Sequence, residues 1–582
     1  MKSYVYLLAP LLSLASVGCS NLNHAPEQPL YTALTKASGG DMPATQRDLR
    51  FKKAELHWQV FPETETLTGH AVLSFVAKAP LQQISVDLDR ELPISQISFN
   101  DQPLTAAQWQ NPEGRVFITL PEQLPQGSAF TISIDYAGKP HQAKHAPWDG
   151  GFVWSKTQDG QPWIATAVQG EGCDLFWPCI DQPMGEPEIA ELFIKVPAPL
   201  VAPSNGKLLG MTEQDGWRTY HWQVTQPNTY AVALNIGPYE ELQTTYHSRY
   251  GHQYPLHYWY LKGDKQAAEG LFAEFPKQLE FFERYIGPYP FWQDKMAAVN
   301  TPHLGMEHQT INAYGNHYAK ELFGYDSLLQ HELAHEWFGN QLTNENWDDF
   351  WLHEGFATYM QPLYAEYLHG QMAYDAQLYG IRAKISNKAP MVSGKSKTEE
   401  GVYDEKRGPG QDIYNKGALL LHTLRNYLGD EKFFRAIREL VYGTADPQPG
   451  NFKPLYSNTK NFIAIVNRVS GQDMTGFFQT YLYQAQLPKL SSQREGDVLK
   501  ISWTQTQGDF SLPVEVLVDG QLRTVPMPQG HGELIVGNAD LIQLDPRQKL
   551  LKDEPYFAEY QAWQHAQKEQ AKAAEQQAKK KQ

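Results

Sequence analysis

The chain has 582 residues, which is too long for a single hydrophobic core and predicts several domains. Its composition, with 41% hydrophobic and 20% charged residues, is that of a globular protein. The formal net charge of −16 disfavours nucleic acid as a partner, because affinity for nucleic acid comes from Lys and Arg side chains that neutralise phosphates.

The first twenty residues have the pattern of a removable export signal. A positively charged start is followed by a mostly apolar run, residues 4–17, that is too short to span a bilayer. The run leads into Gly18-Cys19-Ser20, which resembles a bacterial lipoprotein box with a lipid on Cys19; ordinary secretory cleavage nearby is the alternative. We expect a signal peptide over 1–19 and an exported protein in the cell envelope. Through the lipid it would be held in the bacterial outer membrane, facing the periplasm.

The next segments predict a linker and then a β domain. Residues 20–47 are polar and contain proline, which favours a linker. Over 48–241, short runs rich in β-branched residues are separated by Pro and Gly, and predict an antiparallel β domain. The clearest runs are residues 71–76, 83–88 and 130–135.

The hydrophobic period then changes to that of helices. Residues 242–487 predict a mainly helical domain, with early helices over 267–275 and 279–285 that end near Gly287. Residues 488–552 return to a small β unit, and residues 553–582 form a polar tail that is helical or disordered. The fold class is therefore multidomain α+β.

Three cysteines occur in the chain. With Cys19 assigned to a lipid, Cys173 and Cys179 remain, either as a disulfide in an oxidising compartment or as two buried thiols.

A metal-binding pattern lies within the helical region. His331-Glu332-x-x-His335 places two imidazoles one helical turn apart, so that both face the same ion. Glu354 follows after eighteen intervening residues, which leaves room for a turn and a second antiparallel helix. Two His and one Glu leave a fourth position for water, as in catalytic zinc sites. An amphipathic helix with incidental histidines is the alternative.

These residue types predict a hydrolytic mechanism with one Zn²⁺ per chain. The ion lowers the pKa of water and polarises a carbonyl group. Glu332 would accept the water proton and pass it to the leaving amine. The oxyanion needs a second electrophile, which spacing alone does not locate.

The segment around Glu354 resembles the aminopeptidase N and leukotriene-hydrolase family of zinc peptidases, because Gly-Phe-Ala follows Glu354 after the same gap. Three further segments carry the resemblance over about residues 48–485: Leu304-Gly-Met-Glu-His308, Ile413-Tyr-Asn-Lys-Gly-Ala418, and Gln169-Gly-Glu171 followed by Phe176–Pro183. The family fold implies a thermolysin-like catalytic domain over 242–487.

The resemblance also implies substrate-binding roles. Glu307, with Glu171 as partner and Gln169 beside it, would bind the α-ammonium of a peptide. Gly305 and Met306 would present the backbone of an edge strand to the substrate, and Tyr414 would donate a hydrogen bond to the oxyanion. We therefore expect a zinc aminopeptidase that removes single residues from peptides with a free N-terminus.

The sequence departs from the family pattern in two places. His308 stands where the family has Asn, and Leu304 replaces a Gly, so the geometry near the first substrate residue is open. After residue 485 the chain has only a small β unit and a tail. Many members carry a large helical C-terminal domain there, so we expect a more open cleft.

Several alternatives stay open at this stage. Epoxide hydrolysis, which leukotriene hydrolases perform at the same kind of site, is a second activity. A non-catalytic scaffold is a third, although it would be expected to lack some of the metal and base residues. Asp349 is either a group that orients a ligand histidine or an ordinary surface residue.

Overall fold

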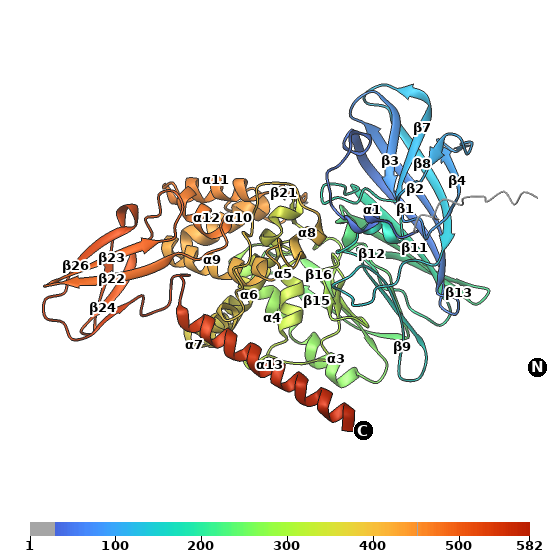
Figure 1. Ribbon diagram of the computed structural model, residues 1–582. Helices are drawn as coiled ribbons and strands as arrows, with labels where there is room; N and C mark the ends of the chain where they lie inside the picture. Colours follow the sequence, from blue (N-terminus) through green and yellow to red (C-terminus); the bar gives the residue numbers. More distant parts are fainter. Residues whose placement is uncertain (1–29, 451, 582) are drawn as a thin grey trace, which may run out of the picture.

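The computed structural model describes residues 30–450 and 452–581, so the predicted signal peptide and Cys19 lie outside the described residues. Within those ranges, no helix combines the length and the apolar character needed to cross a bilayer. A β domain, a mainly helical domain and a small β unit follow one another along the chain and in space (Figure 1). This is the predicted multidomain α+β fold.

The N-terminal domain consists of three sheets. Its strands are β1 (Leu49–Phe61), β2 (Thr66–Ala77), β3 (Leu81–Asp87), β4 (Ile94–Phe99), β5 (Gln102–Pro103), β6 (Trp109–Gln110), β7 (Arg115–Leu124), β8 (Ala129–Gly138), β9 (Gly151–Lys156), β10 (Pro162–Ala167), β11 (Ile189–Pro197), β12 (Lys207–Gln214), β13 (Trp217–Thr225) and β14 (Asn235–Ile236). The main sheet has the order β12-β13-β11-β1-β2-β8-β4-β5, with smaller sheets β3-β7-β6 and β14-β10-β9. Neighbours in the main sheet are antiparallel except β1 and β11, which are parallel. Burial alternates along β8, as expected for strands that cover a core with one face.

The central domain begins with a five-stranded sheet of order β15-β16-β17-β19-β18. Its strands are β15 (Tyr239–His247), β16 (Gln253–Leu261), β17 (Met296–Asn300), β18 (Gly305–Met306) and β19 (Asn312–Tyr314). The helices are α3 (Lys265–Phe272), α4 (Phe275–Tyr285), α5 (Ser327–Ala334), α6 (Trp351–His369), α7 (Gln371–Arg382), α8 (Glu399–Tyr403), α9 (Asp412–Leu428), α10 (Asp430–Tyr442), α11 (Thr459–Ser470) and α12 (Thr475–Leu482). A short parallel pair, β20 (Leu342–Asn344) with β21 (Leu455–Ser457), joins distant parts of the domain.

Two glycines let helices α6 and α9 approach closely. A Cβ atom on Gly355 would lie 3.1 Å from the Cα atom of Gly417, and one on Gly417 would lie 2.9 Å from the Cα atom of Gly355. Such spacing leaves no room for a larger side chain at this crossing. The close approach brings α9, which carries Tyr414, against the helix that carries Glu354.

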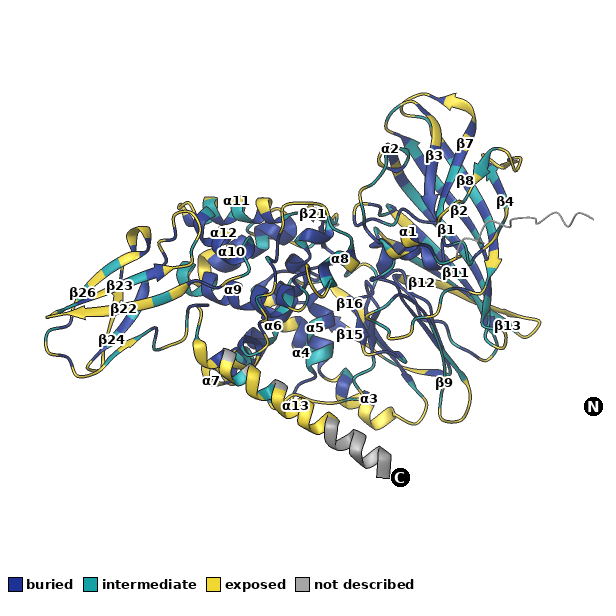
Figure 2. Ribbon diagram, in the orientation of Figure 1, coloured by how far each residue is buried: buried dark blue, intermediate teal, exposed yellow. Residues whose placement is uncertain are grey.

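The C-terminal unit contains two three-stranded sheets, β22-β23-β26 and β25-β24-β27. Their strands are β22 (Lys489–Glu495), β23 (Val498–Thr504), β24 (Val514–Val518), β25 (Gln521–Val525), β26 (His531–Ile535) and β27 (Ile542–Leu544). Helix α13 (Pro555–Lys581) runs back along the helical domain and is largely exposed where its side chains are described (Figure 2). Its first turn is attached through Phe557, whose ring lies 5.5 Å from the guanidinium of Arg382. The tail is thus helical, one of the two states predicted.

The described part of the predicted linker is packed against the N-terminal domain. It contains two short helices, α1 (Ala33–Lys36) and α2 (Ala44–Arg47), and the side chains of Thr35, Ser38 and Gln46 are buried. Gln46 donates from Nε2 to Oδ2 of Asp87 at 2.6 Å. Residues 31–47 therefore belong to the folded body.

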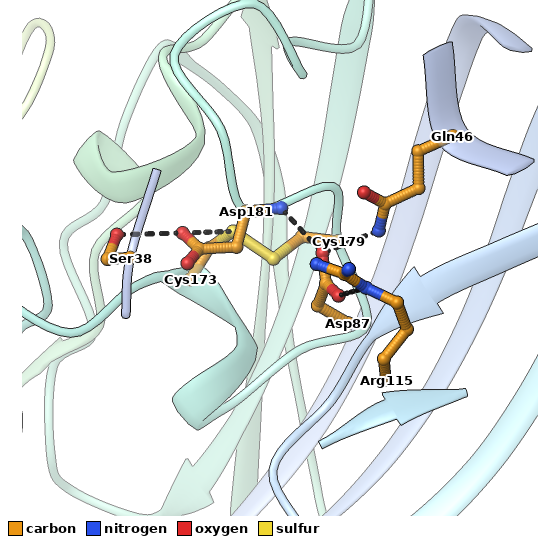
Figure 3. Close-up of a disulfide and its surroundings, with 7 residues drawn as sticks. All are labelled: Ser38, Gln46, Asp87, Arg115, Cys173, Cys179 and Asp181. Carbon is orange, nitrogen blue, oxygen red and sulfur yellow. Dashed lines mark hydrogen bonds and ion pairs between the residues drawn. A yellow bond between two sulfur atoms is a disulfide. The ribbon is translucent and has the colours of Figure 1, made fainter. Parts of the chain in front are cut away.

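The loop that follows β10 is closed by a disulfide between Cys173 and Cys179, which answers the question that the sequence left open (Figure 3). The backbone N–H of Asp181 donates to Oδ2 of Asp87 at 3.1 Å, and Arg115 donates to Oδ1 of the same carboxylate at 2.6 Å. The disulfide and these bonds hold the loop that carries Gln169 and Glu171 on the β domain.

Candidate active site

Helix α5 carries the two histidines of the predicted metal site. Asp326 caps the helix by accepting a hydrogen bond from the N–H of Leu329 at 3.0 Å, and His335 is the C-terminal cap. The Nε2 atoms of His331 and His335 lie 3.2 Å apart. The helix therefore presents both imidazoles to one point, as the four-residue spacing predicted.

Glu354 completes a triangle of ligand atoms from the first turn of α6. Its Oε2 lies 3.4 Å from Nε2 of His331 and 3.4 Å from Nε2 of His335. Ligands bound to Zn²⁺ at about 2.0–2.1 Å with tetrahedral angles are separated by about 3.3 Å. The three atoms are thus arranged to fit a tetrahedral zinc ion.

The protonation of these residues also fits a metal. Nδ1 of His335 lies 2.8 Å from the carbonyl oxygen of Phe338, which only accepts, so Nδ1 is the protonated nitrogen and Nε2 is left to bind an ion. Oε2 of Glu354 is buried and accepts no hydrogen bond from any described residue. Burial lowers the pKa of His335, but Glu354 and Glu307 outweigh it and raise the value to about 10. The two carboxylates therefore favour a positive charge at Nε2 of His335, which a bound metal ion would supply in place of a proton.

Glu332, the predicted general base, lies beside the metal triad. Its side chain is 6% exposed, and burial together with Glu307 raises its pKa well above the ordinary value. A Cβ atom on Gly305 would lie 2.5 Å from Oε1 of Glu332, so a side chain at this position of β18 would displace the Glu332 carboxylate. Strand β18 pairs with β19 alone and is the edge of its sheet, as predicted for Gly305 and Met306.

Tyr414 lies on α9, next to His331. Its ring is 6.2 Å from the ring of His331, with an angle of 22° between the planes. The hydroxyls of Tyr414 and Tyr403 are 2.8 Å apart. Burial and the charge of Glu354 raise the pKa of Tyr414 well above its usual value, so its phenol is a neutral donor at neutral pH.

Glu307 is held by two donors from the N-terminal domain. The hydroxyl of Tyr230 donates to Oε1 of Glu307 at 2.9 Å, and Nε2 of Gln169 donates to the same oxygen. Single ligand-type atoms of Glu307, Glu332 and His335 all lie within 4.8 Å of one another. The predicted amine-binding carboxylate is therefore directly beside the metal triad and the base.

Glu171 lines a cavity of about 710 Å³ between the β domain and helix α8. Glu399, the first residue of α8, is 7% exposed and lines the same cavity. Burial first, and then the charge of Glu171, raise the pKa of Glu399 well above its ordinary value. Among the described residues, Glu171 receives one side-chain hydrogen bond, from the hydroxyl of Tyr31.

The structure shows the surroundings of Asp349 and His308, whose roles the sequence left open. Oδ1 of Asp349 accepts a hydrogen bond from the N–H of Thr459 at 2.9 Å and so holds the start of α11; it does not orient a ligand histidine. His308 is fully buried, and burial lowers its pKa to about 3. Its neutral ring packs in the interior, 6.5 Å from the ring of His303.

Sequence reasoning missed four residues at this site: Tyr31, Tyr230, Glu399 and Tyr403. Each comes from a segment without a recognisable motif. The one available signal was chemical: a buried carboxylate needs donors, so tyrosines near Glu171 and Glu307 were to be expected, but their positions were not.

Two imidazole ligands, one carboxylate as the third ligand and a buried glutamate beside them define the site of a zinc metallopeptidase. Comparisons with known proteins agree. The Peptidase M1 N-terminal domain matches residues 50–230, and the Peptidase family M1 domain matches residues 275–481. The chain belongs to peptidase family M1.

Curated relatives match this chain at low identity. Endoplasmic reticulum aminopeptidase 1 of Mus musculus is 27% identical over 542 residues, which are 85% of this chain and 55% of the relative. Aminopeptidase M1-B of Oryza sativa is 25% identical over 486 residues, 76% of this chain and 51% of the relative. The chain thus spans about half the length of the curated relatives it matches.

A solved structure matches over nearly its whole length. The M1 zinc metallopeptidase from Deinococcus radiodurans, crystallised as a mutant with a Tyr-Ser-Ala substrate, has a TM-score of 0.64 and 25% identity. The match covers 76% of this chain and 96% of that one.

Proposed function

We propose that the chain is a zinc-dependent aminopeptidase that hydrolyses the N-terminal peptide bond of peptides with a free α-amine. The observation that carries the proposal is the position of Glu307 beside Glu332 and His335, with ligand-type atoms within 4.8 Å. The nitrogen of an α-amine is only about 2.5 Å from the first carbonyl carbon of the peptide. A carboxylate that binds the amine at this distance therefore places the first peptide bond, and no later one, at the metal site.

The residues of the chain divide the catalytic work. Bound zinc supplies a Lewis acid that polarises the scissile carbonyl and lowers the pKa of water. Glu332 accepts the proton of the attacking water and transfers it to the leaving nitrogen. Tyr414 donates a hydrogen bond from its phenolic hydroxyl to the developing oxyanion. The backbone of Gly305 and Met306, on the free edge of β18, hydrogen-bonds the substrate main chain as an added strand.

Charge complementarity accounts for the preference for a free N-terminus. An ammonium group that leaves water must be compensated by a nearby anion. Glu307 and Glu171 supply that charge, while Gln169 and Tyr230 fix the carboxylate of Glu307. An acetylated N-terminus has no charge to offer and would leave Glu307 buried without a cation.

The test uses a panel of chromogenic aminoacyl amides and their N-acetylated versions, with the zinc-loaded protein, the chelated protein and the protein with zinc restored. We expect cleavage of free-amine substrates only, lost on chelation and recovered with zinc. Glu307→Gln should raise KM for the free amines by about tenfold or more. Equal cleavage of acetylated substrates would remove Glu307 from this role, and cleavage that persists without metal would reject the zinc mechanism.

We also propose that the protein is exported and carries a lipid on Cys19. The support is the sequence alone, namely the apolar run over 4–17 and Gly18-Cys19-Ser20. Labelling of bacterial cells with a fatty acid should mark the wild type and leave Cys19→Ala unmarked. Equal labelling of both, or of neither, would contradict the assignment.

A further inference from the structure

Residues 31–40 form a segment, here called the strap, that lies across the junction of the β domain and the catalytic domain. Its anchor on the β domain is Asp181, whose Oδ1 accepts from the hydroxyl of Ser38 at 3.1 Å (Figure 3). The carbonyl of Asp181 also accepts from the N–H of Gly39 at 3.3 Å. Its anchor on the catalytic domain is the N–H of Glu399, which donates to the carbonyl of Ser38 at 3.1 Å. The strap therefore connects the loop of Glu171 to helix α8.

The strap is packed too closely to be a loose covering. Gly39 has a φ angle of +71°, and a Cβ atom there would lie 1.7 Å from Nε1 of Trp347. Trp347 begins the 3₁₀ turn that precedes α6, and its ring lies 5.8 Å from the ring of Tyr230, which donates to Glu307. The strap is thus in contact with the same structure that positions the amine-binding carboxylate.

Tyr31 brings the strap into the cavity that contains Glu171. Its hydroxyl donates to Oε2 of Glu171, and the ring is one wall of the cavity that contains Glu171 and Glu399. The ring stacks on His141 with centroids 3.8 Å apart and planes at 8°, and the ammonium of Lys36 lies 4.9 Å from the ring centroid. The ring is therefore held by its own contacts, and the hydroxyl is free to orient the carboxylate.

The bond to Tyr31 leaves Glu171 suited to bind a cation. It engages one carboxylate oxygen, and Oε1 receives no side-chain hydrogen bond from the described residues. Burial and the charge of Glu400 raise the pKa of Glu171 to about 7. A hydrogen bond from the backbone of Gly150 lowers the pKa. A donor to the carboxylate stabilises the anion, so the Tyr31 hydroxyl also favours the charged form of Glu171 and fixes its orientation.

We propose that the strap is part of the substrate-binding site, and that Tyr31 is a positioning residue that orients Glu171 toward the α-ammonium of the peptide. The proposal rests on the function proposed above. In this proposal the strap, whose composition is that of a linker, forms one wall of the pocket for the first substrate residue. The recognised chemistry is a primary ammonium group on a peptide N-terminus.

The test compares Tyr31→Phe, Glu171→Gln and the double variant as zinc-loaded proteins on free-amine aminoacyl amides. Tyr31→Phe keeps the ring contacts and removes only the donor. We expect KM to rise by about tenfold with kcat within twofold, because a hydrogen bond to a charged group is lost. In the Glu171→Gln background, Tyr31→Phe should have no further effect on KM.

Tyr379→Phe is the matched control, because Tyr379 is 54% exposed on α7 and does not line the cavity. Its KM and kcat should equal those of the wild type, and the thermal midpoints of all variants should agree. An unchanged KM in Tyr31→Phe, or effects of Tyr31→Phe and Glu171→Gln that multiply in the double variant, would overturn the proposal. If the wild type cleaves no free-amine substrate, the proposed function fails and the inference fails with it. If the wild type is active and Glu171→Gln raises KM while Tyr31→Phe does not, only the role of the strap is rejected.

Discussion

Tyr414→Phe isolates the contribution of one hydrogen-bond donor to the transition state. The substitution keeps the ring that stacks 6.2 Å from His331 and removes a hydroxyl 2.8 Å from that of Tyr403. The raised pKa keeps Tyr414 a neutral donor, so the whole effect of the substitution should come from the lost hydrogen bond to the oxyanion. Removing one such donor costs about 2.7–4 kcal/mol, or a factor of about 10²–10³ in kcat.

Steady-state kinetics on one free-amine amide, with zinc content measured for each variant, tests this value. KM should change little, since the interaction forms only in the transition state. Tyr403→Phe is the comparison, because it loses only the neighbouring hydroxyl and should lower kcat by about two- to tenfold. A Tyr414→Phe enzyme with kcat within threefold of the wild type, or equal losses in the two variants, would refute the role given to Tyr414.

Three further predictions follow from the same site. Burial and Glu400 raise the pKa of Glu171 to about 7, so Glu171 loses its charge below that pH. KM for free amines should therefore fall as the pH rises to about 7, and increase again above about 8, where the substrate amine loses its proton. Glu171→Gln should abolish the change of KM on the acidic side. Replacing both Cys173 and Cys179 by Ser should lower the free energy of unfolding by about 2 kcal/mol, measured by urea titration, and raise KM; unchanged stability would show that the disulfide does not constrain the loop. Adding zinc to the chelated protein should raise its melting temperature by mass action, while His335→Ala should show no such response; an equal response in His335→Ala would place the ion elsewhere.

The metal site could be predicted because local geometry determines it. A four-residue spacing on one helix fixes His331 and His335 relative to each other, and the gap to Glu354 fits one turn and a second helix. The edge position of Gly305 and Met306 and the placing of Tyr414 came from the family resemblance and agree with the structure. The periodicity of residues likewise gave the β and helical domains.

The remaining parts depend on contacts between distant segments. Helices α1 and α2 have four residues each, so they show no hydrophobic period, and the polar composition of 20–47 indicated a linker. Their buried polar side chains are held by hydrogen bonds to the β domain, such as that of Gln46 to Asp87, and composition does not reveal such bonds. Tyr31 and Tyr230 reach Glu171 and Glu307 over 140 and 77 residues of sequence, and only the folded chain brings them there.

The most direct test of the account is mass spectrometry of the products from one defined peptide of about ten residues, incubated with the zinc-loaded protein. The account predicts a series of products that each lack one more residue from the N-terminus, no products from the N-acetylated peptide, and no series with Glu332→Gln. Internal fragments, or shortening of the acetylated peptide, would contradict it, because Glu307 would then not select the first peptide bond.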